Sequence, residues 1–181
     1  NISIWVLTGT FAGMVLFVAV YNNSYISIFA DASDNNTSAE NLEKLSKYNK
    51  ALVRLAVARN PNTPPKIIKA LAKDEDEVVR LAVARNSNTP VDNLRRLAED
   101  TDNWVRWAVA ENHNTPSEML IVLANDKFWG VRLAVAENPN TPALILNRLA
   151  EDADEGVRLA VGGNHNTPAD VLKRLVKNAD N

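Results

Sequence analysis

One twelve-residue phrase recurs along this chain at a fixed spacing. It begins at residues 53, 79, 105, 131 and 157, so successive copies start 26 residues apart. The first copy reads VRLAVARNPNTP, and all five keep an Arg, two Asn and a Thr-Pro pair at the same places. A fixed period between about 20 and 50 residues is typical of solenoids, whose units are too small to bury their own apolar faces and therefore stack. The period predicts a stack of repeats.

Each repeat has the pattern of two short helices. Residues 53–58 are nearly all apolar and predict a first helix inside the stack, closed at Asn60 by the left-handed conformation that Asn tolerates. Thr63 is expected to accept hydrogen bonds from the free backbone N–H groups at the start of the second helix. Pro64 suits this position, because its missing N–H and its fixed φ do not disturb the first turn of a helix. In that helix Ile68 and Leu71 share one inward face. We expect these side chains of the first helices to be buried between units: Leu55, Val57, Leu81, Val83, Leu133, Val135, Leu159 and Val161.

The array has a degenerate start. Counting back 26 from Asn62-Thr63 reaches Asn36-Thr37, and residues 31–52 predict a linker with a half-repeat. Within it, Thr37 and Glu40 have the spacing of a capping box. Residues 53–181 predict the solenoid itself. Residues 1–30 contain no Asp, Glu, Lys or Arg, so they predict a separate hydrophobic segment and its exit.

Residues 2–21 form an apolar run broken only by Ser, Thr and Gly. A helix of this length would cross a bilayer core of roughly 30 Å, so the run predicts a membrane or assembly helix. A signal peptide is the competing interpretation, but its basic start and cleavage site are not evident. Gly9 and Gly13 predict a small helix-packing face. No Lys or Arg occurs between residue 22 and Lys44, which favours a membrane-anchored chain with its solenoid outside the cytoplasm.

Composition argues against several classes of function. The net charge is −2 and no long basic run occurs, so nucleic acid is not an expected partner. The absence of cysteine excludes disulfides, thiolate zinc sites and cysteine-ligated clusters. His113 and His165 are two units apart, whereas zinc needs three or four ligands close together. No phosphate loop or nucleophile–histidine–acid spacing occurs. We expect no enzyme activity, metal, cofactor or small-molecule substrate.

An arginine recurs on every first helix, and an aspartate recurs in the turns between units. The arginines are Arg54, Arg80, Arg106, Arg132 and Arg158, and the aspartates are Asp74, Asp100, Asp126 and Asp152. The arginines could form an anion-binding row. Pairing with the aspartates of adjacent turns is favoured, because partly buried charges are normally paired.

The departures from the repeat are candidates for partner binding. Trp104, Phe128 and Trp129 replace small or polar residues, and they either contact a partner or fold against the neighbouring turn. Trp107 takes a leucine position and is expected in the core. One column of the first helices changes sign along the array, reading Arg59, Arg85, Glu111 and Glu137. Such a row suits head-to-tail association or is simply a solvated face.

The unit VRLAVARNPNTPPKIIKALAKDEDE resembles the repeat of the leucine-rich repeat variant family, a relative of the HEAT and armadillo solenoids. The resemblance covers residues 53–178 well and 35–52 weakly. It implies an all-α, right-handed superhelix of five 26-residue helix pairs, in which one helix of each pair can be 3₁₀. It also implies a scaffold without a reaction. One family member carries an iron–sulfur cluster, which the lack of cysteine excludes here.

These observations together predict a non-enzymatic scaffold for a protein partner or a homo-oligomer, anchored in a membrane or membrane complex through residues 2–21. Two alternatives stay open. The chain could be a surface-filament subunit with its hydrophobic helix in the filament core, or an accessory subunit of a redox or transport complex. The last helix, residues 168–177, has no polar capping unit after it, and we expect a partner or a second copy to cover it.

Overall fold

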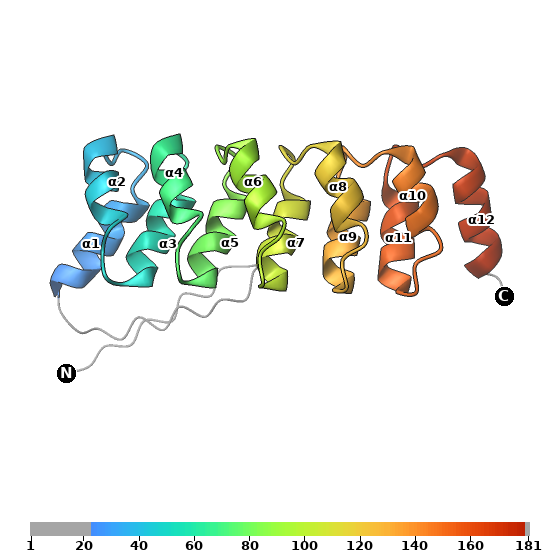
Figure 1. Cartoon of the computed structure of the whole chain (residues 1–181), viewed down its shortest axis with the longest axis horizontal. Helices are drawn as coiled ribbons and strands as arrows, with labels where there is room; N and C mark the ends of the chain where they lie inside the picture. The colour runs from blue at the N-terminus through green and yellow to red at the C-terminus, as the bar shows by residue number, and fades with distance from the viewer. Residues whose placement is uncertain (1–22, 180–181) are drawn as a thin grey trace.

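The computed structural model describes residues 23–179, where every helix is an α-helix, neither helix of a pair being 3₁₀. The first helices of the pairs are α1 (Asn23–Ser33), α3 (Ala51–Arg59), α5 (Glu77–Arg85), α7 (Asn103–Glu111), α9 (Trp129–Glu137) and α11 (Glu155–Gly163). The second helices are α2 (Ala39–Leu45), α4 (Pro65–Leu71), α6 (Val91–Leu97), α8 (Ser117–Leu123), α10 (Ala143–Leu149) and α12 (Ala169–Ala179). The pairs stack along one axis (Figure 1), so the predicted all-α solenoid is confirmed.

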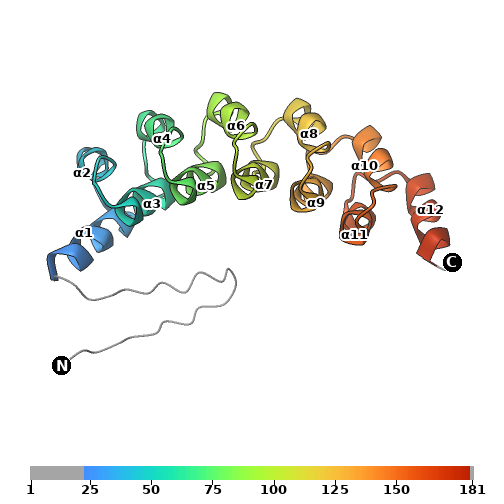
Figure 2. The ribbon, with the colours of Figure 1, turned by 60° about the horizontal axis from the view of Figure 1, so that its bottom comes forward.

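The solenoid has two rows of helices and a curved shape. The first helices form an inner row on the concave side, and the second helices form an outer row on the convex side (Figure 2). Neighbouring inner helices pack directly against one another from α1 to α11. They carry buried alanines such as Ala56, Ala82 and Ala108. Since the distance between packed helices depends on the side chains at the contact, these alanines let the inner row pack closely and favour the curvature.

Asn60 joins adjacent units, and the left-handed closure expected there is wrong. Its backbone is extended, with φ −66° and ψ 122°. The buried side-chain amide donates to the carbonyl oxygens of Ala32 at 3.2 Å and Asp34 at 2.9 Å, both in the preceding unit. Its Oδ1 accepts from the backbone N–H of Asn62 at 2.9 Å. The same arrangement recurs at Asn86, Asn112, Asn138 and Asn164.

The threonines close the first helices, so the expectation that they start the second helices is wrong. The Thr63 hydroxyl donates to the carbonyl oxygen of Val57 at 2.6 Å. Helix α4 begins after Pro64, which makes no side-chain capping bond. The predicted capping box is also wrong, because Thr37 donates to the Asp31 carbonyl and Ser38 caps α2. A hydroxyl can both donate and accept, and here it donates a hydrogen bond to a nearby carbonyl at the end of the preceding helix.

The leading unit contains both helices, so the expected half-repeat is a complete pair in the structure. Helix α1 packs on α2 and on α3, and Ala32 and Leu42 are fully buried. The bonds from Asn60 to this unit match those at later joints. The sequence concealed α1 because residues 27–33 match the repeated phrase only in part.

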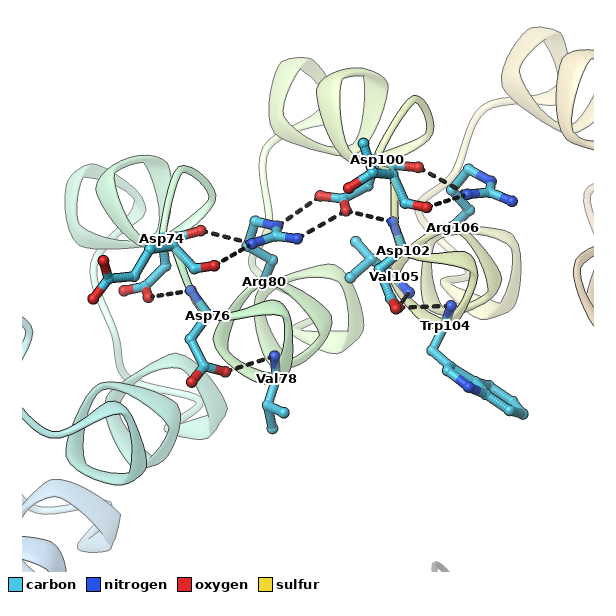
Figure 3. Close-up of polar contacts among 11 residues, drawn as sticks. Asp74, Asp76, Val78, Arg80, Asp100, Asp102, Trp104, Val105 and Arg106 are labelled. Atoms are coloured by element: carbon cyan, nitrogen blue, oxygen red, sulfur yellow. Dashed lines mark hydrogen bonds and ion pairs between the residues drawn. The ribbon is translucent and has the colours of Figure 1, made fainter.

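The arginine row fastens successive turns, as predicted. Arg80 donates through Nε and Nη2 to both carboxylate oxygens of Asp100, at 2.7 and 3.0 Å, and through Nη1 to the Asp74 carbonyl at 2.8 Å (Figure 3). Arg54, Arg106 and Arg132 form equivalent pairs with Asp74, Asp126 and Asp152. Burial acts to raise the pKa of Asp100, but the hydrogen bonds from Arg80 and the Asp102 N–H bring it below its ordinary value. Each of these four arginines thus ties the turn before its helix to the turn after its unit, whereas Arg158 donates to the carbonyls of Asp152 and Ala153 in the turn before its helix.

The core lies between the two rows. Val57, Val83, Val135 and Val161 are fully buried, as predicted, and so are second-helix residues such as Leu94. Burial is also confirmed for Leu55, which is 3% exposed. It is wrong for three leucines at the same position in later units. Leu81 and Leu133 are half-buried and Leu159 is 69% exposed, because this column lies at the edge of the concave face.

Candidate functional site

The concave face is formed by the solvent-facing residues of the inner helices. In α5 these are Glu77, Val78, Leu81 and Arg85, whose spacing places them on one side of the helix. Figure 3 shows Val78 and Trp104 extending away from the outer row. We define the apolar stripe as Leu52, Val78, Leu81, Trp104, Trp107, Trp129, Leu133 and Leu159. We define the charged row as Arg59, Arg85, Glu111 and Glu137.

Four aromatic rings meet in the middle of the apolar stripe, and we call them the aromatic platform. Trp104 lies edge-on to Trp107, with ring centroids 5.8 Å apart, and edge-on to Phe128 at 5.2 Å. Phe128 in turn contacts Trp129 at 5.8 Å. Trp104 and Trp129 remain 51% and 48% exposed. Because edge-to-face contacts fix ring orientations, the platform presents two oriented and accessible indoles.

In the fourth of the repeated units, helix α9 begins at this platform without a side-chain cap. Asp76, Asp102 and Asp154 cap their helices by accepting from backbone N–H groups. Phe128 stands at the same position before α9 and makes no capping bond. A Cβ at Gly130 would lie 2.7 Å from Cε1 of Phe128, so the glycine leaves room for the ring. Losing such a cap costs about 0.5–2 kcal/mol, so the sequence here favours aromatic contact over local helix stability.

The charged row is paired in its middle and acidic at its C-terminal end. Arg85 Nε lies 3.1 Å from Glu111 Oε2, and its guanidinium lies 4.6 Å from the centroid of the Trp107 ring. Burial raises the pKa of Glu137, and the negative charge of Glu111 raises it further. Within residues 23–179, no ion pair joins Glu137 to a cation.

The structure brings both groups of candidate residues onto one face. Trp104 and Trp129 lie on the same concave surface as the charged row, whereas the sequence showed them only as separate irregularities. The Phe128 ring folds against its neighbours, one of the two expected outcomes. The placement of Trp107 in the core is wrong, because the ring lies half-buried at the concave surface under Arg85.

Sequence reasoning missed the apolar stripe as a surface. Leu81 and Leu133 were assigned to the core because most leucines of a repeat are buried. A signal was present, since each lies four residues before a charged residue, Arg85 or Glu137, on the same helix. Residues four apart share a helix face, so the charge places these leucines near solvent. The spacing alone does not decide their exposure, because Leu55 lies four residues before Arg59 and is buried.

Other predicted positions do not form a site in the described part of the chain. His113 and His165 are exposed in turns. No group of three or more His, Asp or Glu that could hold a metal ion occurs among the described residues. Gly9, Gly13 and the rest of residues 2–21 lie outside residues 23–179. Of the helices that are described, none has both the length and the apolar character needed to cross a membrane.

Comparisons with known proteins follow the repeat. A family model described as "Leucine rich repeat variant" matches residues 51–76, 78–102 and 129–154. A solved structure described as "a leucine-rich repeat variant with a novel repetitive protein structural motif" is 26% identical in sequence, with a TM-score of 0.48. The match covers 76% of this chain and 65% of the solved chain. A comparison with curated proteins finds no match.

Proposed function

Because three of its repeats match the leucine-rich repeat variant family, we propose that this chain is a non-catalytic scaffold that binds a protein partner on its concave face. Stacked repeats create extended concave surfaces that repeat proteins use for binding. The observation that carries the proposal is the aromatic platform, where Trp104 and Trp129 are half-exposed yet held by other rings. Tryptophan is enriched among the residues that dominate interface energies, and rigid rings lose little entropy on binding.

The test compares partner capture by the native full chain and by the double variant Trp104→Ala, Trp129→Ala. We expect the native chain to cross-link a defined partner and the double variant to lose it. Leu144→Ala is the matched control, because Leu144 lies on the outer row and is 76% exposed. A partner that cross-links equally to all three proteins would contradict binding at the concave face.

We also propose that residues 2–21 anchor the scaffold in a membrane or membrane complex, with the solenoid outside the cytoplasm. The run has no charged residue and suits the thickness of a bilayer core. The absence of Lys and Arg between residue 22 and Lys44 supports the orientation. Alkaline carbonate should leave the chain in membranes, and protease added to intact cells should digest the solenoid. Carbonate release would argue against the anchor, and protection from protease would argue against the orientation.

The same segment supports a second candidate, a filament subunit whose apolar helices pack through Gly9 and Gly13. Polymers that persist without detergent and are lost in Gly9→Leu, Gly13→Leu would favour the filament. A monodisperse particle that needs detergent would favour the anchored scaffold. If that particle also holds a redox or transport complex together, the scaffold is its accessory subunit.

A further inference from the structure

The two halves of the concave face differ in charge. Toward the N-terminus the face carries Arg59 and Arg85 beside Glu77. From α7 to α11 its solvent-facing positions carry Glu111, Glu137 and Glu155, and no Lys or Arg among them. Arg85 neutralises Glu111 from the neighbouring helix, which leaves the acidic half without a cation for Glu137. The exposed indoles of the aromatic platform lie in this same half.

The chain itself shows how this face holds a cation. The guanidinium of Arg85 lies over the Trp107 ring and its Nε contacts the Glu111 carboxylate. An aromatic face and a carboxylate attract the same cation, the first through the ring quadrupole and the second through its charge. One unit further along, Glu111 takes the place of Arg85 and faces Glu137. The next step of the row therefore has the carboxylate, and Leu133 in place of the Trp107 ring, but lacks the cation.

We propose that the acidic half of the concave face, from α7 to α11, binds a basic amphipathic peptide segment of the partner protein. Its apolar side chains lie on the aromatic platform and Leu133, and a lysine or arginine lies between Glu111 and Glu137. This inference rests on the proposed function, because it names the partner class for the same face. It adds a charge requirement that the aromatic platform alone does not impose.

Geometry also sets the spacing of the peptide. Packed helices lie about 8–10 Å apart, and a chain in the polyproline II conformation advances about 3.1 Å per residue with three residues per turn, so residues three apart share a face. One unit of the solenoid therefore corresponds to about three peptide residues. A peptide with basic residues three apart presents one cation to each successive carboxylate of the row.

Other occupants fit this half of the face less well. Residues 2–21 of the chain contain no charged residue, so they could not neutralise Glu137. An acidic peptide would meet Glu111, Glu137 and Glu155 directly, and like charges brought together at an interface are costly.

The experiment measures binding of three labelled synthetic peptides to the detergent-solubilised full chain by fluorescence anisotropy. The peptides share Leu and Phe positions and carry Lys, Ser or Glu at every third residue. We expect the Lys peptide to bind roughly tenfold more tightly than the Ser peptide, and the Glu peptide to bind most weakly. Raising the salt from about 0.1 M to about 1 M shortens the Debye length from about 10 Å to about 3 Å and should remove most of this preference.

Variants of the chain test the contribution of charge and the contribution of the apolar contacts to peptide affinity separately. Glu137→Lys should weaken the Lys peptide about tenfold and strengthen the Glu peptide, whereas Glu118→Lys on the outer row should change neither. Trp104→Ala should weaken all three peptides by about tenfold or more. Thermal unfolding of each variant checks that it is folded.

The outcomes distinguish this inference from the proposed function. Equal affinity for the three peptides, with loss in Trp104→Ala, overturns the basic partner and leaves the concave interface standing. Binding that ignores both Trp104 and Glu137 overturns both. No binding by any peptide overturns the basic peptide and leaves the concave interface to the cross-linking test. A dimer of the chain that Glu137→Lys dissociates would assign the face to a second copy and overturn the peptide proposal.

Discussion

The asparagine that ends each inner helix connects three backbone groups at a buried joint. Asn112 is 8% exposed, and its amide donates to the carbonyls of Ala84 at 2.7 Å and Asn86 at 3.3 Å in the preceding unit. Its Oδ1 accepts from the Asn114 N–H at 2.8 Å. Because buried backbone groups need partners, this one side chain satisfies groups that no helix or strand would satisfy.

Replacing Asn112 with Ala removes the partners of the Ala84 carbonyl and the Asn114 N–H, while the Asn86 carbonyl still accepts from Thr89 N–H, so we expect a loss of about 2–4 kcal/mol in the free energy of unfolding. Asn114→Ala is the matched control. The exposed Asn114 makes one bond between units, to the Ser87 carbonyl at 2.6 Å, and its loss should cost about 0.5–1.5 kcal/mol. Urea unfolding measures both, and an equal or smaller effect at Asn112 would contradict the role of the joint.

The pair between Arg80 and Asp100 is largely buried, with side chains 15% and 9% exposed. Asp100→Ala leaves a guanidinium without its carboxylate, and we expect a loss of about 3–5 kcal/mol. Adding Arg80→Met should restore most of it, because an apolar replacement removes the unpaired charge. The exposed Glu75→Gln should change stability by less than about 0.5 kcal/mol. A double variant no more stable than Asp100→Ala would show that the pair is not the cause.

Helix α9 begins with an aromatic ring in place of the capping aspartate of α5, α7 and α11. Gly130→Ala would place a Cβ 2.7 Å from the Phe128 ring, and we expect it to lower stability and displace Trp104. Gly162→Ala in α11 is the matched change, since its Cβ would meet only Leu175 at 3.9 Å and other units carry Ala there. It should stabilise the chain by about 0.5–1 kcal/mol. Thermal unfolding and tryptophan fluorescence measure both, and a stabilising Gly130→Ala would contradict the tight contact.

The repeat predicted the helix pairs, the valine core and the arginine–aspartate pairs, because each depends on spacing or on charge balance within the chain. It did not predict which apolar column faces solvent. Alanine and valine already fill the narrow space between inner helices, so Leu81 is left at the concave edge. The conformation of Asn60 depends on hydrogen bonds to carbonyls of another unit, so local sequence propensity could not predict it. The shared concave face of Trp104 and Glu111 depends likewise on stacking.

The paired aspartates run through the turns of the whole molecule and make its stability sensitive to acid. Burial is the largest influence on Asp74, Asp100 and Asp126 and acts to raise the pKa, but the arginine hydrogen bond, a backbone N–H bond and the nearby arginine charges together outweigh it, so each pKa lies below the ordinary value of 3.8. For Asp152 the bond from Arg132 is the largest influence and lowers the pKa too. A carboxylate whose pKa is lower in the folded chain than in the unfolded chain stabilises the fold. This stabilisation is complete above the unfolded pKa, about 3.9, and is lost as the pH falls through the folded pKa.

We therefore expect the melting temperature to be nearly constant from about pH 5 to pH 8 and to fall steeply below about pH 4. Asp100→Ala, measured in parallel, should start lower and lose less on acidification, because one of the linked carboxylates is already gone. Circular dichroism at each pH gives the curves. A native chain whose melting temperature holds down to about pH 2 would contradict the linkage.

The asparagine joint has a consequence for how such a chain can change over generations. The asparagine side chain donates to main-chain carbonyls of the previous unit, and every residue type has such a carbonyl. One copy of the unit can therefore follow any other copy, and no matching side chain has to arise at the same time. Unequal crossing-over that duplicates or deletes 26 residues would lengthen or shorten the array by one whole step and preserve the frame. Substitutions on the concave helix positions can then accumulate copy by copy, which is how a monotonous architecture acquires a surface that differs from one step to the next.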